Sequence, residues 1–214
     1  MYLNQFSVRV PEGHEKMSGY VEMEHGKKYT LVLRNDCDVR CDAEISIDGK
    51  AVGTFRLGAH GNIRLERKLD DEGCFTFYQL GSDEAERAEL GKVSASDLGL
   101  IRVVFTPEQQ YHYVPYIPWI ESWGGNTCDI TPNTTTIYDT SAVTGDLSYA
   151  SVTIDCAGGT GLSGHSDQSF ISVDDMCLDY SRQTTIHLRL VANRDDGPRP
   201  LHPVTRTSPI PPPV

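Results

Sequence analysis

The fold of this chain is decided by the stretch Ala43-Glu44-Ile45-Ser46-Ile47, then Asp48-Gly49, then Ala51-Val52-Gly53-Thr54-Phe55-Arg56-Leu57. Apolar and polar side chains alternate before Asp48-Gly49, which is the pattern of a strand with one buried face. Asp-Gly is a favoured pair for a two-residue turn because glycine and aspartate tolerate positive φ. The stretch therefore predicts a β-hairpin.

Further segments with alternating or β-branched side chains flank this hairpin on both sides. One short helix is predicted over residues 83–90, with Ser82 as its N-cap and Gly91 as its end. Short strands separated by turn residues are typical of a β-sandwich or jelly roll. The other predicted strands are residues 6–10, 29–33, 62–67, 75–78, 99–106, 151–154 and 184–191.

The predicted fold class is therefore all-β, and the composition changes along the chain divide it into four parts. Residues 1–107 are predicted to form an antiparallel β-sandwich or jelly-roll domain. An aromatic and proline-rich connector follows over residues 108–126, then a smaller, loop-rich β region over residues 127–194. Residues 195–214 are predicted to be an extended proline-rich tail.

Charge and hydropathy exclude several kinds of partner. The 214 residues carry a net charge of −11, and no Lys or Arg lies between Arg102 and Arg182. Phosphate backbones require clustered basic side chains, so we expect no direct binding to nucleic acid. The apolar runs are far shorter than the roughly 20 residues of a membrane helix, and residues 1–6 do not read as a signal peptide. We therefore expect synthesis in a cytoplasm, with the six cysteines reduced and mostly buried.

The residues predicted to contact a partner are aromatic and proline side chains. In the connector, the aromatic side chains either pack onto the β body or anchor a neighbouring subunit, and the sequence leaves both interpretations open. In the tail, consecutive prolines favour a polyproline segment that lies along a neighbour. These residues are Tyr111, Tyr113, Tyr116, Trp119, Trp123, Pro211, Pro212 and Pro213.

Several short motifs imitate reactive sites but lack the context that the chemistry needs. Residues 159–164 match G-x-G-x-x-G without a following helix, so we interpret them as a flexible loop. Ser166 lies in an incomplete nucleophile elbow, and its neighbours His165 and Asp167 are too close in sequence to form a relay with it.

Metal sites are equally incomplete. Cys37 and Cys41 have no second cysteine pair for zinc, and Asp174-Asp175 or Asp36 and Asp38 offer at most a loop site for calcium. We predict no catalytic residue, no metal centre and no cofactor, and hence a protein that is not an enzyme.

Five segments resemble a β-sandwich module found in proteins of double-stranded DNA viruses and some microbial eukaryotes. They are residues 40–57, 73–77, 99–105, 161–166 and 184–190. The resemblance implies a virion structural protein, such as a capsid decoration or cement protein of a tailed phage. It implies binding to the major capsid protein or other virion subunits, as a homo-oligomer or as lattice-bound copies on the capsid surface. It carries no catalytic motif and therefore transfers no active site.

Two other functions compete with this one. A carbohydrate-binding module would use Trp119, Trp123 and the nearby tyrosines to stack on sugar rings, by analogy with other β-sandwiches. A hydrolase would use Ser166 or a metal ion. A glycan array distinguishes the first of these, and ester and glycoside substrate panels distinguish the second.

Overall fold

The predicted hairpin is present in the computed structural model, which describes residues 1–16, 19–110 and 157–193. Strand β6 (Cys41–Ile47) pairs antiparallel with β7 (Lys50–Leu57). The turn residues Asp48 and Gly49 have φ angles of 52° and 72°, the left-handed conformation expected for this turn. Along β6 the odd-numbered residues are buried, so the alternation in the sequence becomes one face packed into the core.

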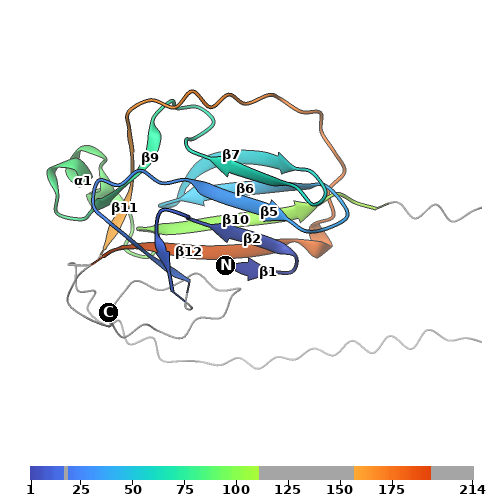
Figure 1. Ribbon diagram of the computed structural model, residues 1–214, viewed down its shortest axis with the longest axis horizontal. Coiled ribbons are helices and arrows are strands. Elements are labelled where there is room, and N and C mark those ends of the chain that lie inside the picture. Colours follow the sequence, from blue (N-terminus) through green and yellow to red (C-terminus); the bar gives the residue numbers. More distant parts are fainter. Residues whose placement is uncertain (17–18, 111–156, 194–214) are drawn as a thin grey trace, which may run out of the picture. The chain divides into compact units, whose positions relative to one another are not determined.

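The hairpin forms one edge of a six-stranded sheet (Figure 1). Strand β12 (Thr184–Ala192) lies inside this sheet, because it pairs parallel with β4 (Tyr20–Met23) and antiparallel with β10 (Leu100–Pro107). The long strands pair antiparallel with one another. Both β12 and its partner β10 are long, at 9 and 8 residues. The strand order is β3 (His14–Glu15), β4 (Tyr20–Met23), β12 (Thr184–Ala192), β10 (Leu100–Pro107), β6 and β7.

A second, four-stranded sheet is wholly antiparallel. Val8 and Leu33 face each other in its central pair and are fully buried, while Arg9 and Arg34 point to the other side and are exposed. The strand order is β1 (Tyr2–Leu3), β2 (Phe6–Arg9), β5 (Leu31–Asn35) and β8 (Asn62–Leu65).

The inner faces of these two sheets share one hydrophobic core. Buried residues of β2, β5 and β8 belong to the same cluster as buried residues of β6, β10 and β12. Phe6 of the small sheet stacks on Phe105 of the large sheet, with ring centroids 4.7 Å apart. The two sheets therefore pack face to face, and the prediction of a mostly β protein is confirmed.

A two-stranded sheet and a short helical segment lie beside this core (Figure 1). In the helical segment, the Ser82 side chain accepts a hydrogen bond from the Ala85 N–H at 3.2 Å, which confirms the predicted cap. A small apolar cluster, which includes Ala85, Leu90 and Leu98, fixes this segment to the body. The elements are β9 (Cys74–Gln79), β11 (Gly158–Ser163), α1 (Asp83–Arg87) and the 3-10 turn η1 (Leu90–Lys92); a further 3-10 turn, η3 (Tyr180–Arg182), precedes β12.

The prediction of a flexible loop over residues 159–164 is wrong, because residues 158–163 form strand β11. This strand pairs with β9 along its whole length. A side chain at Gly158 would overlap the Phe77 ring, and one at Gly161 would overlap the Tyr78 ring. The glycines are therefore required because aromatic side chains of β9 occupy the space above them.

Most of the other predicted strands are present in the structure. The segments predicted at residues 6–10, 29–33, 62–67, 75–78, 99–106 and 184–191 are strands, with bounds shifted by one or two residues. The short strands β1, β3 and β4 were not predicted. The predicted strand at residues 151–154 and the proline-rich tail at residues 195–214 lie outside the described residues, as does the connector from residue 111 onward.

Candidate functional site

The predicted partner-binding residues cannot be placed. Tyr111, Tyr113, Tyr116, Trp119, Trp123 and the three prolines Pro211, Pro212 and Pro213 all lie outside the described residues. The predicted contact surface of the connector and the tail therefore stays a prediction. Among the described residues, the outer face of the four-stranded sheet and an extended segment expose charged or apolar side chains, and a small pocket lies at the hairpin turn.

The first surface is the outer face of the four-stranded sheet, which we call the arginine face. Tyr2 of β1 lies opposite Ser7 of β2, and Ser7 lies opposite Arg34 of β5. One step along the sheet, Arg9 of β2 lies opposite Val32 of β5. The pleat directs these side chains away from the core, and Tyr2, Arg9 and Arg34 are exposed.

Two acidic residues hold arginines of this face in place. The Arg34 Nε donates a hydrogen bond to the Asp36 carboxylate at 2.6 Å. The Arg64 side chain donates to Thr30 and to the Glu12 carboxylate, at 3.0 and 3.1 Å. Partial burial alone would raise the pKa of Glu12, but hydrogen bonds from Thr30 and the Arg64 charge outweigh it and keep the pKa below its usual value.

A shallow depression of about 510 Å³ lies on the arginine face. Its volume falls within the range of about 300–1,000 Å³ that is usual for small-molecule sites. Basic, hydroxyl, amide, carboxylate and phenol groups all border it, so it can bind a ligand that is both charged and rich in hydroxyl groups. Its lining is Met1, Tyr2, Ser7, Arg9, Val32, Arg34, Asp36 and Asn62.

Sequence reasoning missed this face. The alternation in Phe6-Ser7-Val8-Arg9-Val10 does place Arg9 on the polar side of its strand. However, the register that sets Arg9 beside Arg34 depends on a pairing between strands that are 25 residues apart (34 − 9). No local pattern contains that information.

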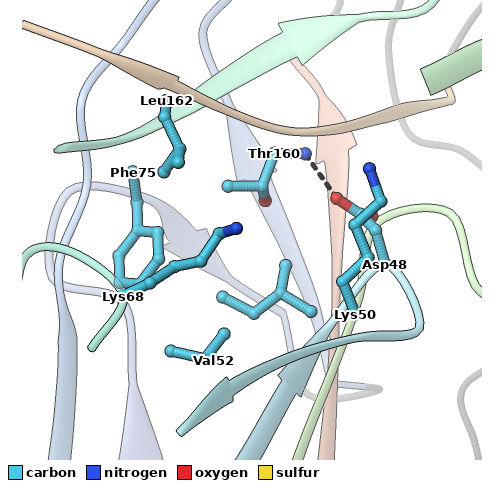
Figure 2. Close-up of a pocket in the computed structure, with 8 residues that line it drawn as sticks. Asp48, Lys50, Val52, Lys68, Phe75, Thr160 and Leu162 are labelled. Carbon is cyan, nitrogen blue, oxygen red and sulfur yellow. Dashed lines mark hydrogen bonds between the residues drawn. The ribbon is translucent and has the colours of Figure 1, made fainter. Parts of the chain in front are cut away.

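The small pocket lies at the hairpin turn, where Asp48 is almost completely buried (Figure 2). Its carboxylate accepts hydrogen bonds from the backbone N–H groups of Gly99 and Thr160, at 2.5 and 2.7 Å. Burial raises the pKa of Asp48 to about 6, although both hydrogen bonds and the charges of Lys50 and Arg189 oppose the rise.

This pocket is too small to be a ligand site. Its volume of about 30 Å³ is close to that of one or two water molecules. Figure 2 shows Lys68 extending across it toward Thr160, from the side on which Phe75 lies. The Thr160 hydroxyl in turn hydrogen-bonds the buried Tyr29 hydroxyl at 2.7 Å. The cluster therefore ties the hairpin turn to β11, and its role is structural.

The second surface is an extended segment, residues 166–174, which we call the surface arm. Gln168 fixes it to the body, because its carbonyl oxygen accepts from the Arg67 Nε at 2.8 Å and its side chain accepts from the Glu66 N–H at 3.0 Å. The Phe170 ring lies beneath the Arg67 guanidinium, 4.6 Å from its centre, and packs against Phe55 of β7. The arm runs from the end of β11 back toward β12 (Figure 1).

The surface arm exposes apolar side chains, although other residues of the arm are hydrogen-bonded to the body of the protein. Ile171 is 88% exposed and Val173 is 59% exposed. Leu69, whose carbonyl group accepts a hydrogen bond from Arg67, is also 51% exposed. Asp174, which follows Val173 in the surface arm, accepts a hydrogen bond from Arg56 of β7 through its carbonyl oxygen. The surface arm thus presents two exposed apolar side chains on a backbone that hydrogen bonds from Arg56 and Arg67 fix to the body.

The residues of the incomplete nucleophile elbow do not form a relay. The Ser166 hydroxyl donates to the Glu66 carboxylate at 3.1 Å, and its oxygen accepts from the Gln168 N–H at 3.2 Å. His165 points instead to the carboxylates of Glu72 and Asp167, at 3.3 and 3.2 Å. Ser166 is thus an anchor of the surface arm.

The described ranges contain no group of three or more His, Cys, Asp or Glu side chains that could hold a metal ion. Cys37, Cys41 and Cys74 are free and buried, and Cys177 is free and exposed. Burial, with smaller contributions from Cys37 and Asp42, raises the pKa of the Cys41 thiol to about 12. No helix among the described residues is long and apolar enough to cross a membrane.

The fold and the two surfaces define a mostly β protein whose described side chains offer shallow surface sites. No family model, no curated protein and no solved structure matches the chain.

Proposed function

We propose that this chain is a virion structural protein that decorates a capsid and stabilises the lattice of the major capsid protein. It acts by binding and not by catalysis, and it occupies the capsid surface after synthesis in the host cytoplasm. Many copies, each held weakly, together give strong attachment through multivalency.

The observation that carries this proposal is the surface arm. Ile171 and Val173 are exposed on an extended backbone that Arg56 and Arg67 hold in place. Because this backbone is already ordered, binding a neighbouring subunit costs little conformational entropy. Burial of these apolar side chains then supplies the driving force for attachment.

The architecture supports the same function. We propose that the two face-to-face sheets are a β-sandwich of the jelly-roll kind, which the chain uses as a rigid platform. In the described part of the chain, β7 and β3 are the edge strands of the large sheet, and their outward main-chain groups offer donors and acceptors to a neighbour. The aromatic connector and the proline-rich tail would add further contacts to the same shell.

Particles purified from the source culture provide the test. Quantitative mass spectrometry should find the chain in stoichiometric proportion to the major shell protein. Added back to particles that lack the chain, the double variant Ile171→Asp with Val173→Asp should bind at least about tenfold more weakly, because it places charges in an apolar contact. Binding is measured by co-sedimentation over a range of concentrations.

Tyr180→Asp is the matched control, since Tyr180 is 71% exposed and lies outside the surface arm. This variant should bind as the parent chain does. Particles that contain no stoichiometric amount of the chain would contradict the capsid role. Equal binding by the arm variant and the parent would contradict the role of the arm.

A further inference from the structure

On the arginine face, Arg9 and Arg34 both border the depression, in a protein of strongly negative net charge. Arg9 lies opposite Val32, and Arg34 follows two residues later on the same face of β5. This is a diagonal cross-strand position, in which the two residues are about 7–8 Å apart. Two guanidinium groups at that spacing can converge on one carboxylate.

Their hydrogen-bonding capacity is largely unused. Among the described residues, the Arg9 side chain has neither an ion-pair nor a hydrogen-bond partner. Arg34 uses only its Nε, on Asp36, within the same part of the chain. Asp36 thereby restrains the guanidinium through Nε and leaves its two Nη groups for other acceptors. Oriented arginine donors of this kind are the usual receptors for planar oxyanions.

The surroundings of the two arginines determine what kind of anion fits. Tyr2, 50% exposed, lies in the same cross-strand row as Arg34 and offers an aromatic ring beside the cations. Ser7 and Asn62 border the depression with hydroxyl and amide groups. An aromatic ring, neutral polar groups and a cationic pair together match a sugar ring that carries a carboxylate.

We infer that the arginine face is a binding site for uronic acid residues of an acidic polysaccharide. The uronate carboxylate lies between Arg9 and Arg34, and the sugar ring packs against Tyr2. The sugar hydroxyl groups exchange hydrogen bonds with Ser7 and Asn62. This site is separate from the surface arm, so either proposal can fail without the other.

The test is a titration of the full chain, labelled with ¹⁵N, with trigalacturonate and with neutral galactotriose, followed by amide NMR shifts. Trigalacturonate should shift the amides of β1, β2 and β5, and its binding should weaken as salt is added. The neutral trisaccharide should bind at least about tenfold more weakly, because it lacks the charge-assisted contacts. No shifts with trigalacturonate, or equal shifts with both sugars, would overturn the inference.

Two further ligands separate a sugar site from a simple anion site. Triglutamate has as many side-chain carboxylates as trigalacturonate has ring carboxylates, but it has no sugar rings. Sulfate is a small anion that has neither sugar rings nor carboxylates. Both should bind more weakly than trigalacturonate. If either binds as tightly, the polysaccharide assignment is overturned and the face is an acceptor of acidic peptides or of anions in general.

Single substitutions locate the site. Arg9→Gln and Arg34→Gln should each weaken trigalacturonate binding about tenfold, since each removes a charged donor. Arg102→Gln is the control, because Arg102 is an exposed arginine of β10 in the other sheet. All three positions are exposed, and circular dichroism checks that the variants fold. Unchanged affinity in both Arg9→Gln and Arg34→Gln would place binding elsewhere and overturn the inference.

Discussion

At the scale of the residue, Asp48 combines two roles that oppose each other energetically. Its position in the turn and its hydrogen bonds to Gly99 and Thr160 favour the fold. Its burial raises the pKa to about 6, above the value of about 3.9 in an unfolded chain. The ionised carboxylate therefore costs stability at neutral pH, and the protonated form removes that cost.

The sign of this effect gives a prediction. Because the folded pKa is the higher one, the stability from this group is fully present below pH about 3.9 and is lost as the pH rises through about 6. The free energy of unfolding of the parent chain, relative to Asp48→Asn, should therefore increase as the pH falls from 7 to 4.5. A gain of about 1–2 kcal/mol is expected over this range.

Urea denaturation at several pH values measures the gain. The comparison with Asp48→Asn is needed because His187 acts in the opposite direction. Burial and the charges of Arg102 and Arg189 lower the pKa of His187, so its contribution to stability is lost as the pH falls below about 6.5. Both chains contain His187, and its contribution cancels. If the free energy of unfolding changes with pH by the same amount in both chains, the ionisation of Asp48 is not coupled to folding.

Asp48 also shows which structural features a local sequence pattern can predict and which it cannot. Asp48-Gly49 predicts a tight turn because the conformation depends on these two residues alone. The bonds of the carboxylate go to residues that are 51 and 112 positions away, and nothing near Asp48 encodes them. The arginine face was missed for the same reason, since each arginine is recognisable but their proximity depends on strand register.

At the scale of the element, β11 is rich in glycine, a residue that is depleted in strands, where β-branched and aromatic side chains are usual. Gly158 lies against the ring of Phe77, which is fully buried in the core. Alanine at this position should therefore lower the free energy of unfolding by about 1–3 kcal/mol, because the ring cannot move without disturbing its neighbours. Chemical denaturation of Gly158→Ala measures this loss.

Gly91→Ala is the matched control. A side-chain carbon at Gly91 would meet nothing within 4 Å, and the residue is exposed in a short 3-10 turn. This substitution should leave stability almost unchanged. An equal loss in both variants would mean that the overlap with the Phe77 ring is not what requires glycine at residue 158, since the entropic effect of Gly→Ala alone is stabilising.

The elements that sequence patterns predicted are the long strands, in which several alternating residues face one core. β2, β6, β10 and β12 belong to this group. Strand β11 was interpreted as a loop because glycine is depleted in strands, and only the aromatic side chains of β9 explain its presence. Strand β4 was missed because its four residues are nearly all buried and show no alternation.

At the scale of the whole molecule, the shared core couples the two main sheets. All described residues belong to one compact unit, and Phe6 and Phe105 stack across the two sheets. If either sheet unfolds, the apolar inner face of the other becomes exposed to water. We therefore expect both sheets to unfold in one cooperative transition.

Hydrogen exchange in mild denaturant tests this expectation. The amides of Leu33 in the small sheet and Leu188 in the large sheet should show the same opening free energy and the same dependence on denaturant. The exposed surface arm around Ile171 should exchange at lower free energy and serves as the internal reference. A clear difference between Leu33 and Leu188 would show that the sheets are separate cooperative units.

The position of β12 has a consequence for how the protein is made. This strand begins at residue 184, yet it lies between β4 and β10 and contributes Ile186, Leu188 and Leu190 to the core. While the chain emerges from the ribosome, β4 and β10 have no partner for the edges that β12 will occupy. The large sheet is completed only after synthesis has passed residue 192, and until then its unpaired edges are prone to association with other chains.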